Sequence, residues 1–136
     1  MIRLTTGQIS AFWDAIKYAD FQSNQVPVVE QFDRGRDLLL RLLSDQCQAW
    51  VLCEGEEKSK QVCAIAITEV TLNLNKEKEV LLRAIYAFRP SQDDNLYKQS
   101  IEELKVFARN IDAKGIYTFS KSERQYYLIE KVCGLS

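Results

Sequence analysis

The hydrophobic pattern of this chain changes its period twice, and this change limits the possible folds more than any other feature. Residues 48–54, 62–74 and 80–88 are rich in β-branched and aromatic residues, and charged turns at 55–60 and 75–78 separate them. On both sides of this block, apolar residues recur three and four positions apart. The middle therefore predicts an antiparallel meander of three strands, and the flanks predict amphipathic helices that cover it.

The first flank predicts a short strand at residues 1–4 and then a helix that Thr5 or Thr6 can cap. The apolar face of this helix carries Ile9, Phe12, Trp13, Ile16 and Ala19. Residues 21–32 hold Pro27 between two valines, which predicts an extended connection and a candidate lid or partner-contact loop. Asp33 then predicts the cap of a second helix. Its buried stripe is expected to be Leu38, Leu39, Leu42 and Leu43.

The second flank predicts a helix, a strand at 116–119 and further helical turns at 123–131. The helix has apolar residues at Tyr97, Ile101, Leu104, Ala108 and Ile111. One face of the predicted strand at 62–74 carries the small residues Ala64, Ala66 and Thr68, which favours a closely packed helix there. The fold class is α/β (α+β): a mixed, mostly antiparallel central sheet flanked by helices. The expected order is β-α-α-β-β-β-α-β-α in a single domain, residues 1–136.

Composition excludes several functions. The 18 basic and 19 acidic residues nearly cancel, so no global field attracts nucleic acid or an anionic membrane. No apolar run approaches the roughly 20 residues that span a bilayer, and residues 1–6 lack the plan of a signal peptide. We therefore expect a soluble cytoplasmic protein.

The chain has no histidine, which excludes Ser-His-Asp and Cys-His catalysis and His-ligated metal sites. Its four cysteines contain no CxxC spacing, so no metal site is predicted and free thiols are expected. Cys47, Cys53 and Cys63 are interpreted as small buried residues on or near strands.

The C-terminal half resembles the acyl-CoA-binding half of the Gcn5-related N-acetyltransferase (GNAT) superfamily. The carrier segments are Leu104-Lys105-Val106-Phe107-Ala108-Arg109-Asn110-Ile111-Asp112, which leads into Ile116-Tyr117-Thr118-Phe119, and Ile129-Glu130-Lys131-Val132-Cys133-Gly134-Leu135. Asp112 stands where glycine is usual, and Ile129 stands at the place of a tyrosine. The element order extends this resemblance over nearly the whole chain.

A narrower resemblance is to small GNAT-like proteins of bacteriophages and prophages, whose roles are unassigned. It rests on Phe12-Trp13-Asp14-Ala15-Ile16, the leucine-rich second helix, Gln48-Ala49-Trp50-Val51-Leu52 and the strand at 65–70. It implies a phage-related origin, hence a location in the host cytoplasm, or association with the virion.

The resemblance implies acetyl-CoA as the cofactor and places its pyrophosphate at residues 92–97. The implied binding residues are Ala87, Phe88, Arg89, Gln92, Asn95, Leu96, Tyr97 and Lys98. Relatives have glycines where Asn95 and Tyr97 stand here, because several bare N–H groups at a helix N-terminus hold the anion. A tyrosine ring fills that space, and Asp93 and Asp94 repel a diphosphate while they favour an empty helix end. Arg89 and Lys98 offset part of that repulsion.

Acetyl transfer also needs a base and an acid. Glu69 and Glu79 are the candidate bases, and Tyr126 or Tyr127 could replace the tyrosine missing at Ile129. Each residue also has a structural interpretation, as a solvent-facing carboxylate or as a packing ring, so the catalytic residues stay unassigned.

Two hypotheses remain. The favoured one is a GNAT-shaped protein without catalysis that serves as a binding or assembly module for an unknown protein partner; the alternative is an N-acyltransferase acting on an unknown amine. Aromatic residues at 12, 13, 21 and 50 could extend to an interface, although helical spacing favours the core. Nucleic-acid contact through Arg34, Arg36 and Arg41 is weaker still, because a solvated helix face explains them.

Overall fold

The computed structural model describes residues 1–54, 61–88, 94–120 and 125–131. Its elements in chain order are β1 (Ile2–Arg3), α1 (Thr6–Ser23), α2 (Val28–Leu43), β2 (Cys47–Glu54), β3 (Gln61–Leu72), β4 (Lys78–Ala87), α3 (Asp94–Asn110), β5 (Gly115–Ser120) and β6 (Gln125–Lys131). The strands form one six-stranded sheet in the order β1-β2-β3-β4-β5-β6. Only β4 and β5 are parallel among these neighbours, because α3 carries the chain back across the sheet between them.

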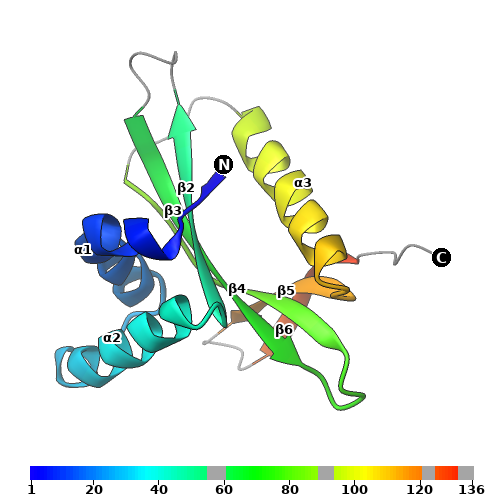
Figure 1. Cartoon of the computed structure of the whole chain (residues 1–136), viewed down its shortest axis with the longest axis horizontal. Coiled ribbons are helices and arrows are strands. Elements are labelled where there is room, and N and C mark those ends of the chain that lie inside the picture. Colours follow the sequence, from blue (N-terminus) through cyan, green and yellow to red (C-terminus); the bar gives the residue numbers. More distant parts are fainter. Residues whose placement is uncertain (55–60, 89–93, 121–124, 132–136) are drawn as a thin grey trace.

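Helices lie on both faces of the sheet (Figure 1). On one face, α1 and α2 pack over β2, β3 and the second half of β4 around Ile16, Leu38, Ile65 and Ile67. On the other, α3 packs over β3, β4 and β5. This mixed α/β architecture, mostly antiparallel and flanked by helices, confirms the predicted fold class.

The face beneath α3 carries the small side chains that the sequence indicated. Ala64 and Ala66 lie in one cluster with Leu104 and Ala108 of α3, and all four are buried. Helix α3 ends at Asn110, and Asp112 follows with φ of 60°, the left-handed conformation in which glycine is favoured. Asp112 therefore adopts the backbone geometry expected of the glycine whose place it takes.

The expected extended connection at 21–32 is wrong. Helix α1 continues to Ser23, and α2 begins at Val28, so only residues 24–27 join them. Pro27, not Asp33, is the N-cap residue of α2; proline suits a helix start, where its missing N–H leaves no bond unmade. The helices meet closely at Gly35, where a Cβ would lie 3.4 Å from the Phe21 ring.

The second helix buries fewer of its leucines than expected. Leu38 and Leu42 are buried, Leu39 is half-buried, and Leu43 is exposed, as is Leu40. The exposed apolar surface of α2 continues at its start with Val28, Val29 and Phe32.

The predicted helix at 123–131 is also wrong, because Gln125–Lys131 forms β6 antiparallel to β5. Tyr126, Tyr127, Leu128 and Ile129 are aromatic or branched residues that suit a strand. Pairing with β5 outweighs their helix-like spacing. The observed order is β-α-α-β-β-β-α-β-β.

Candidate functional site

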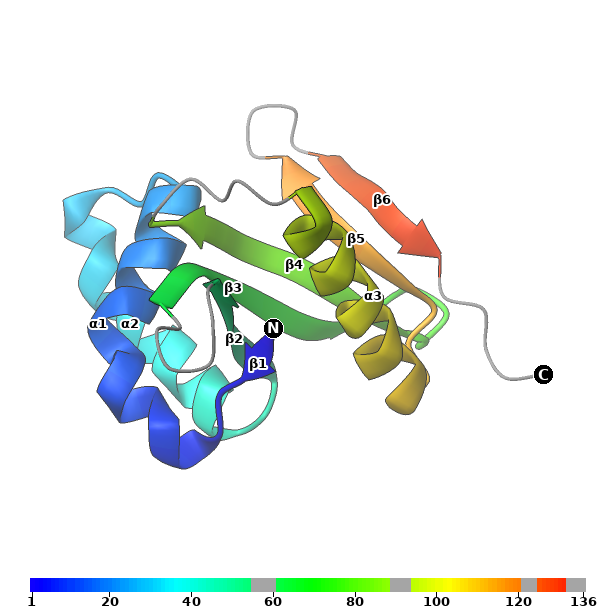
Figure 2. The same cartoon turned by 90° about the horizontal axis from the view of Figure 1, so that it is seen from above.

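The candidate site lies where β4 and β5 separate. The two strands pair only through Val80 with Ile116, Leu81 with Tyr117 and Leu82 with Thr118. Beyond Leu82, β4 continues beside β3, and beyond Thr118, β5 continues beside β6. Figure 2 shows the two strands diverging toward their C-terminal ends. Among the described residues, one side of 83–87 therefore has no neighbouring strand.

A β-bulge marks the start of the opening. Ile67 pairs with Ala84 and Thr68 with Leu82, so Arg83 has no partner residue in β3. A bulge changes the direction of a side chain and interrupts pairing, and bulges are common beside active sites. The Arg83 side chain reaches the α1 side of the sheet, where only 10% of it is exposed.

The C-terminal end of α1 contacts the open side of β4. Ser23 Oγ donates to the carbonyl of Ile85 at 2.9 Å, and Asn24 Nδ2 donates to the carbonyl of Arg83 at 3.3 Å. These bonds satisfy two carbonyl groups of β4 beyond its last pair with β5. They also fix the end of α1 at the mouth of the opening.

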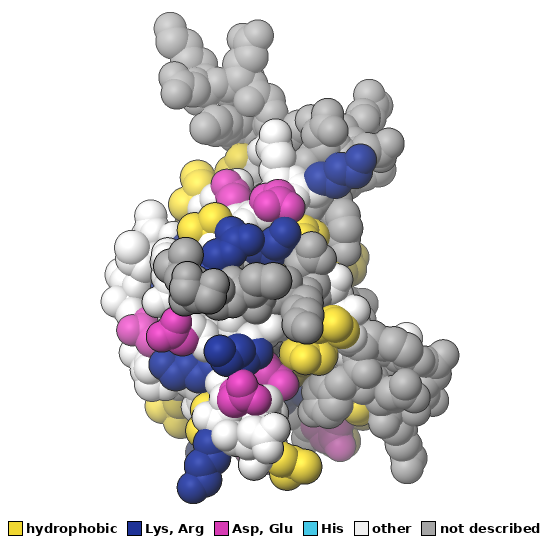
Figure 3. Space-filling view, turned by 90° about the vertical axis from the view of Figure 1, so that its right-hand side faces the viewer, with side chains coloured by type: hydrophobic (Ala, Val, Ile, Leu, Met, Phe, Trp, Pro, Cys, Tyr) yellow, Lys and Arg dark blue, Asp and Glu magenta, His cyan; other side chains and the backbone are white. Residues whose placement is uncertain are grey.

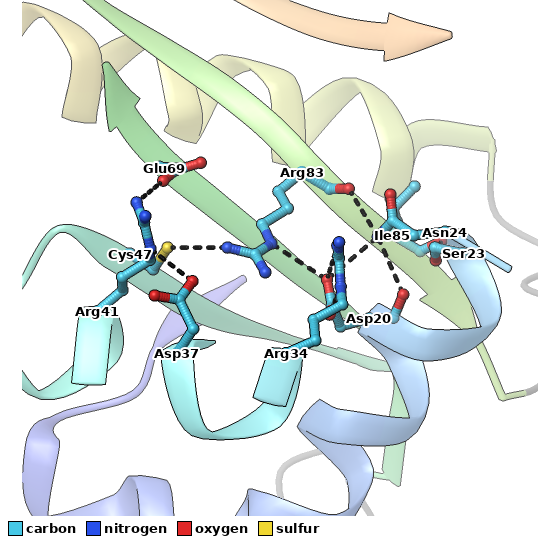
Figure 4. A network of polar contacts seen from close by, with 10 residues as sticks. All are labelled: Asp20, Ser23, Asn24, Arg34, Asp37, Arg41, Cys47, Glu69, Arg83 and Ile85. Atoms are coloured by element: carbon cyan, nitrogen blue, oxygen red, sulfur yellow. Dashed lines mark hydrogen bonds and ion pairs between the residues drawn. The ribbon is translucent and has the colours of Figure 1, made fainter. Parts of the chain in front are cut away.

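Asp20 organises the charges behind this opening (Figure 4). Its carboxylate is fully buried and accepts bonds from Arg34 Nε at 2.7 Å, Arg34 Nη2 at 3.0 Å, Arg83 Nε at 3.2 Å and Asn24 Nδ2 at 3.1 Å. The hydrogen bond to Asp20 raises the pKa of the Arg34 guanidinium above its ordinary value. Two guanidinium groups therefore share one buried carboxylate, which leaves a net positive charge at this end.

A second charged group lies along the same face. Arg41 donates to Glu69 and, from Nε at 2.8 Å, to Asp37, one turn earlier in α2. The hydrogen bond to Asp37 raises the pKa of Arg41. The Glu69 side chain is only 13% exposed. Two carboxylates and one guanidinium leave a net negative charge here.

Cys47 lies between the two groups, with its Sγ 3.8 Å from Arg83 Nη1. Burial raises the pKa of this thiol from 9.0 to about 11. It is therefore protonated near neutral pH, and a protonated buried thiol is a poor nucleophile. We exclude Cys47 as the site of covalent catalysis.

Three adjoining hollows follow the seam in the described part of the chain. The first, of about 270 Å³, lies at the opening and is lined by Ser23, Asn24, Arg83 and Phe119, among others. The second, of about 320 Å³, shares the last three of these and adds Arg34, Arg41, Asp37 and Glu69. The third, of about 550 Å³, adjoins the second at Leu81, which lines both. Each is large enough for part of a small ligand.

The third hollow is mainly apolar and lies at the β3–β4 turn. Leu72, Leu74, Leu81 and Tyr117 line it, and Leu72 and Leu74 are exposed. Glu79 also lines it and accepts a hydrogen bond from Asn73 at 3.1 Å.

The structure describes part of the predicted cofactor site. Ala87 and Phe88 lie where β4 ends, both exposed, and the Phe88 ring is 5.2 Å from that of Tyr86. Lys98 is exposed on α3. Arg89 and Gln92 lie outside the described residues, as do the side chains of Asn95, Leu96 and Tyr97, whose backbones belong to α3. The arrangement of these eight residues around a cofactor stays a prediction.

The candidate bases lie in different hollows. Glu69 turns inward to Arg41 and does not point into solvent, whereas Glu79 lines the apolar hollow. Tyr126 and Tyr127 lie on β6 opposite Phe119 and Thr118, and their side chains are outside the described residues. The sequence analysis missed Asp20 and Arg83. The available signal was Asp20 itself, which continues the buried stripe of Ile9, Ile16 and Ala19, where a carboxylate needs a partner.

Two of the three arginines assigned to solvent have ion pairs instead. Arg34 and Arg41 turn toward the sheet, and Arg36 alone of the three is exposed. On the face over α3, basic and acidic side chains are interspersed (Figure 3). Among the described residues, no helix is long and apolar enough to cross a membrane, and no three potential metal ligands of the His, Cys, Asp or Glu type cluster.

The solved structures that share this arrangement include a predicted, a probable and a possible acetyltransferase. A predicted acetyltransferase from Clostridium acetobutylicum, crystallised with acetyl-CoA, matches 91% of this chain and 82% of its own with a TM-score of 0.62 and 11% identity. A probable acetyltransferase matches 89% of this chain and 79% of its own, with a TM-score of 0.62 and 10% sequence identity. A possible acetyltransferase from Clostridium difficile 630 matches 90% of this chain and 79% of its own, with a TM-score of 0.59 and 8% sequence identity.

This chain shares the fold of these three structures. No family model matches the sequence, and no curated protein matches it either. At about 10% identity the likeness concerns the fold alone, since one fold hosts many functions. The predicted architecture, a mostly antiparallel central sheet flanked by helices, is confirmed at this level.

Proposed function

We propose that this protein transfers an acyl group from acyl-CoA, with acetyl-CoA as the simplest donor, to an amine at the β4–β5 opening. The observation that carries the proposal is the opening itself, with its bulge at Arg83 and the hollow that Ser23, Asn24 and Phe119 line. Apart from the carbonyls of Arg83 and Ile85, which accept bonds from Asn24 and Ser23, the open side of β4 gives an extended, amide-containing arm a backbone to lie against. Acetyl-CoA fits this end of the site, since its arm is slender and its acyl end needs little volume.

In the proposed reaction, acetyl-CoA supplies the activated acyl group. The amine nitrogen attacks the thioester carbonyl carbon, the carbon–sulfur bond breaks, and the amine loses a proton as the thiolate gains one. Glu69 is the carboxylate best placed to attract the amine and take its proton, because it lines the charged hollow and is largely shielded from water. Leu81 and Phe119 give the same hollow an apolar wall. We assign no acid.

The experiment is unfolding with and without acetyl-CoA. Acetyl-CoA at about a hundred times its dissociation constant raises the free energy of unfolding by about 2.7 kcal/mol if only the folded state binds it. Release of the CoA thiol with a panel of amines then measures transfer. Absence of any stabilisation would overturn acyl transfer from this donor.

A second candidate is a binding or assembly module without catalysis, and the acidic loop favours it. Asp93, Asp94 and Tyr97 stand where an anion needs bare N–H groups. This candidate predicts that Asn95→Gly with Tyr97→Gly creates acetyl-CoA binding that the parent lacks. Binding by the parent, followed by acetylation of an amine, contradicts it. A phage-related origin and an unknown protein partner belong to this second proposal; genes for phage proteins beside this one would support the origin.

A further inference from the structure

The charged and apolar hollows together define an acceptor of mixed chemistry. The charged hollow is lined at one end by Arg34 and Arg83, which share the buried carboxylate of Asp20 behind it, and at the other end by the negative group of Arg41, Asp37 and Glu69. Three guanidinium groups and three carboxylates cancel overall. A site with such a division of charge is complementary to a ligand that has one charge of each sign.

Arg83 has capacity for an anion. Its Nε bonds to Asp20, and its Nη1 meets only the Cys47 sulfur among the described residues. A thiol sulfur is a weak acceptor, and Cys47 is protonated because burial raises its pKa to about 11. A ligand carboxylate would therefore give the outer edge of this guanidinium a stronger partner than it has in the protein.

The other end suits an ammonium group. Glu69 and Asp37 share the single guanidinium of Arg41, and both line the hollow. A ligand ammonium there restores the balance of charge. Because a zwitterion brings no net charge, it leaves the neutral site neutral, whereas a simple amine or a simple carboxylate would not.

The apolar hollow gives the third element of recognition. Leu81 lines both the charged hollow and the apolar one, so the two hollows adjoin at this side chain. Leu72, Leu74 and Tyr117 form a wall that matches a large apolar group. Leu72 and Leu74 are 66% and 104% exposed among the described residues.

We propose that the acyl acceptor is a free α-amino acid with a large apolar side chain, such as phenylalanine. Its carboxylate binds toward Arg83, its amino group toward Glu69, and its side chain in the hollow of Leu72, Leu74 and Tyr117. This inference rests on the proposed function, and it adds the substrate class.

Four matched compounds test it: L-phenylalanine, phenethylamine without the carboxylate, 3-phenylpropionate without the amine, and L-alanine without the apolar group. Dissociation constants are measured by calorimetry on the full chain with acetyl-CoA present, and thiol release is followed in parallel. We expect L-phenylalanine to bind at least tenfold more tightly than each of the others. Equal or tighter binding of phenethylamine overturns carboxylate recognition, and equal binding of L-alanine overturns the role of the apolar hollow.

Two variants with matched controls locate the binding. Glu69→Gln keeps the size of the side chain and is expected to weaken the binding of L-phenylalanine at least tenfold, with the binding of 3-phenylpropionate unchanged. Its control is Asp14→Asn, at a fully exposed carboxylate of α1. Leu74→Ser is expected to weaken L-phenylalanine and leave L-alanine unchanged, and Val29→Ser, at a similarly exposed site on α2, is the control. Equal effects of a variant and its control overturn the placement.

The two proposals fail differently. Binding of acetyl-CoA without preference for L-phenylalanine overturns the acceptor class and leaves acyl transfer standing. Absence of acetyl-CoA binding removes acyl transfer and the acceptor role together, even if L-phenylalanine binds.

Discussion

The two faces of the sheet are built on opposite principles. Beneath α3, small and branched side chains interlock, and the central contacts of Ala64, Ala66, Leu104 and Ala108 are apolar. Beneath α1 and α2, an apolar core at Ile65 and Ile67 gives way to six charged side chains along the seam of β4 and β5. Apolar packing stabilises in proportion to buried area, whereas buried charges give little net stability and much geometric definition. Both faces therefore stabilise the sheet through apolar packing, and the face beneath α1 and α2 also shapes a site.

Asp20→Asn should have the largest effect on stability, because it leaves two guanidinium groups beside a neutral side chain in a buried place. Breaking a buried ion pair in this way costs about 3–5 kcal/mol. Urea unfolding measures the loss. Asp37→Asn, at a carboxylate that is 54% exposed, is the control and should cost no more than about 1 kcal/mol. Similar losses in the two variants would remove the contrast between a buried and an exposed charge.

Replacing the whole charged group sharpens the comparison. Asp20→Leu with Arg34→Met and Arg83→Met removes all three charges at once, and such replacements of buried ion networks are often neutral or stabilising. We expect stability within about 2 kcal/mol of the parent by urea unfolding. A loss as large as that of Asp20→Asn would show that the charges themselves stabilise this face.

On the apolar face, Leu104→Ala should cost about 2–4 kcal/mol, because Leu104 is only 2% exposed and its removal leaves a cavity against Ala64 and Ala66. Val106→Ala in the same helix, at a side chain that is 51% exposed, controls for the change in helix propensity. Thermal or urea unfolding compares the two. Equal effects would contradict the tight packing described for α3.

Between the two groups, Cys47 gives a pH signature. Because its pKa is about 11 in the folded protein against 9.0 ordinarily, the folded state binds the proton more tightly. This contribution is fully present below pH 9 and is lost as the pH rises from 9 to 11, to a total of about 2–3 kcal/mol. Unfolding at several pH values in this window should show the fall. Cys47→Ala should flatten it, and an unchanged slope in that variant would assign the fall to other groups.

The smallest effect is expected away from both faces. Phe32→Ser, at a ring that is 77% exposed on α2, should change the free energy of unfolding by no more than about 0.5 kcal/mol. Sedimentation of the parent and the variant checks whether this ring is covered in solution. A large loss of stability, or a change in the sedimentation coefficient, would mean that α2 has a further contact.

The strands and helices of the two cores followed from sequence periodicity because burial imposes it. The alternation through Ala64, Ile65, Ala66 and Ile67 predicted both faces of β3. The same rule failed at residues 123–131, where helical spacing coincided with aromatic and branched residues and pairing with β5 determined the outcome. The hydrophobic pattern of a segment does not show which strand it will pair with in the folded protein.

The site was harder to predict, since it depends on contacts far apart in the chain. Asp20 meets Arg83 across 63 positions, and Glu69 meets Arg41 across 28. A charged residue on a helix is usually interpreted as solvent-exposed. Asp20 lies on the same helix face as the buried Ile9, Ile16 and Ala19, so its helical position would have predicted its burial. The bulge at Arg83 depends on the register of β3, which no local pattern shows.

The two tryptophans lie on opposite sides of the sheet, so the fluorescence of each can report on the unfolding of its own side. Trp50 lies beneath α3, with its ring 5.3 Å from that of Phe107 and its indole N–H bonded to Thr68, whereas Trp13 lies on α1 with Lys17 over its ring. With Trp13→Phe or Trp50→Phe, the remaining indole reports the melting of one side only. If the unfolding curves of the two variants coincide, both sides unfold as a single cooperative unit. If the curves are separated, their midpoints give the order in which the helices on the two faces of the sheet unfold.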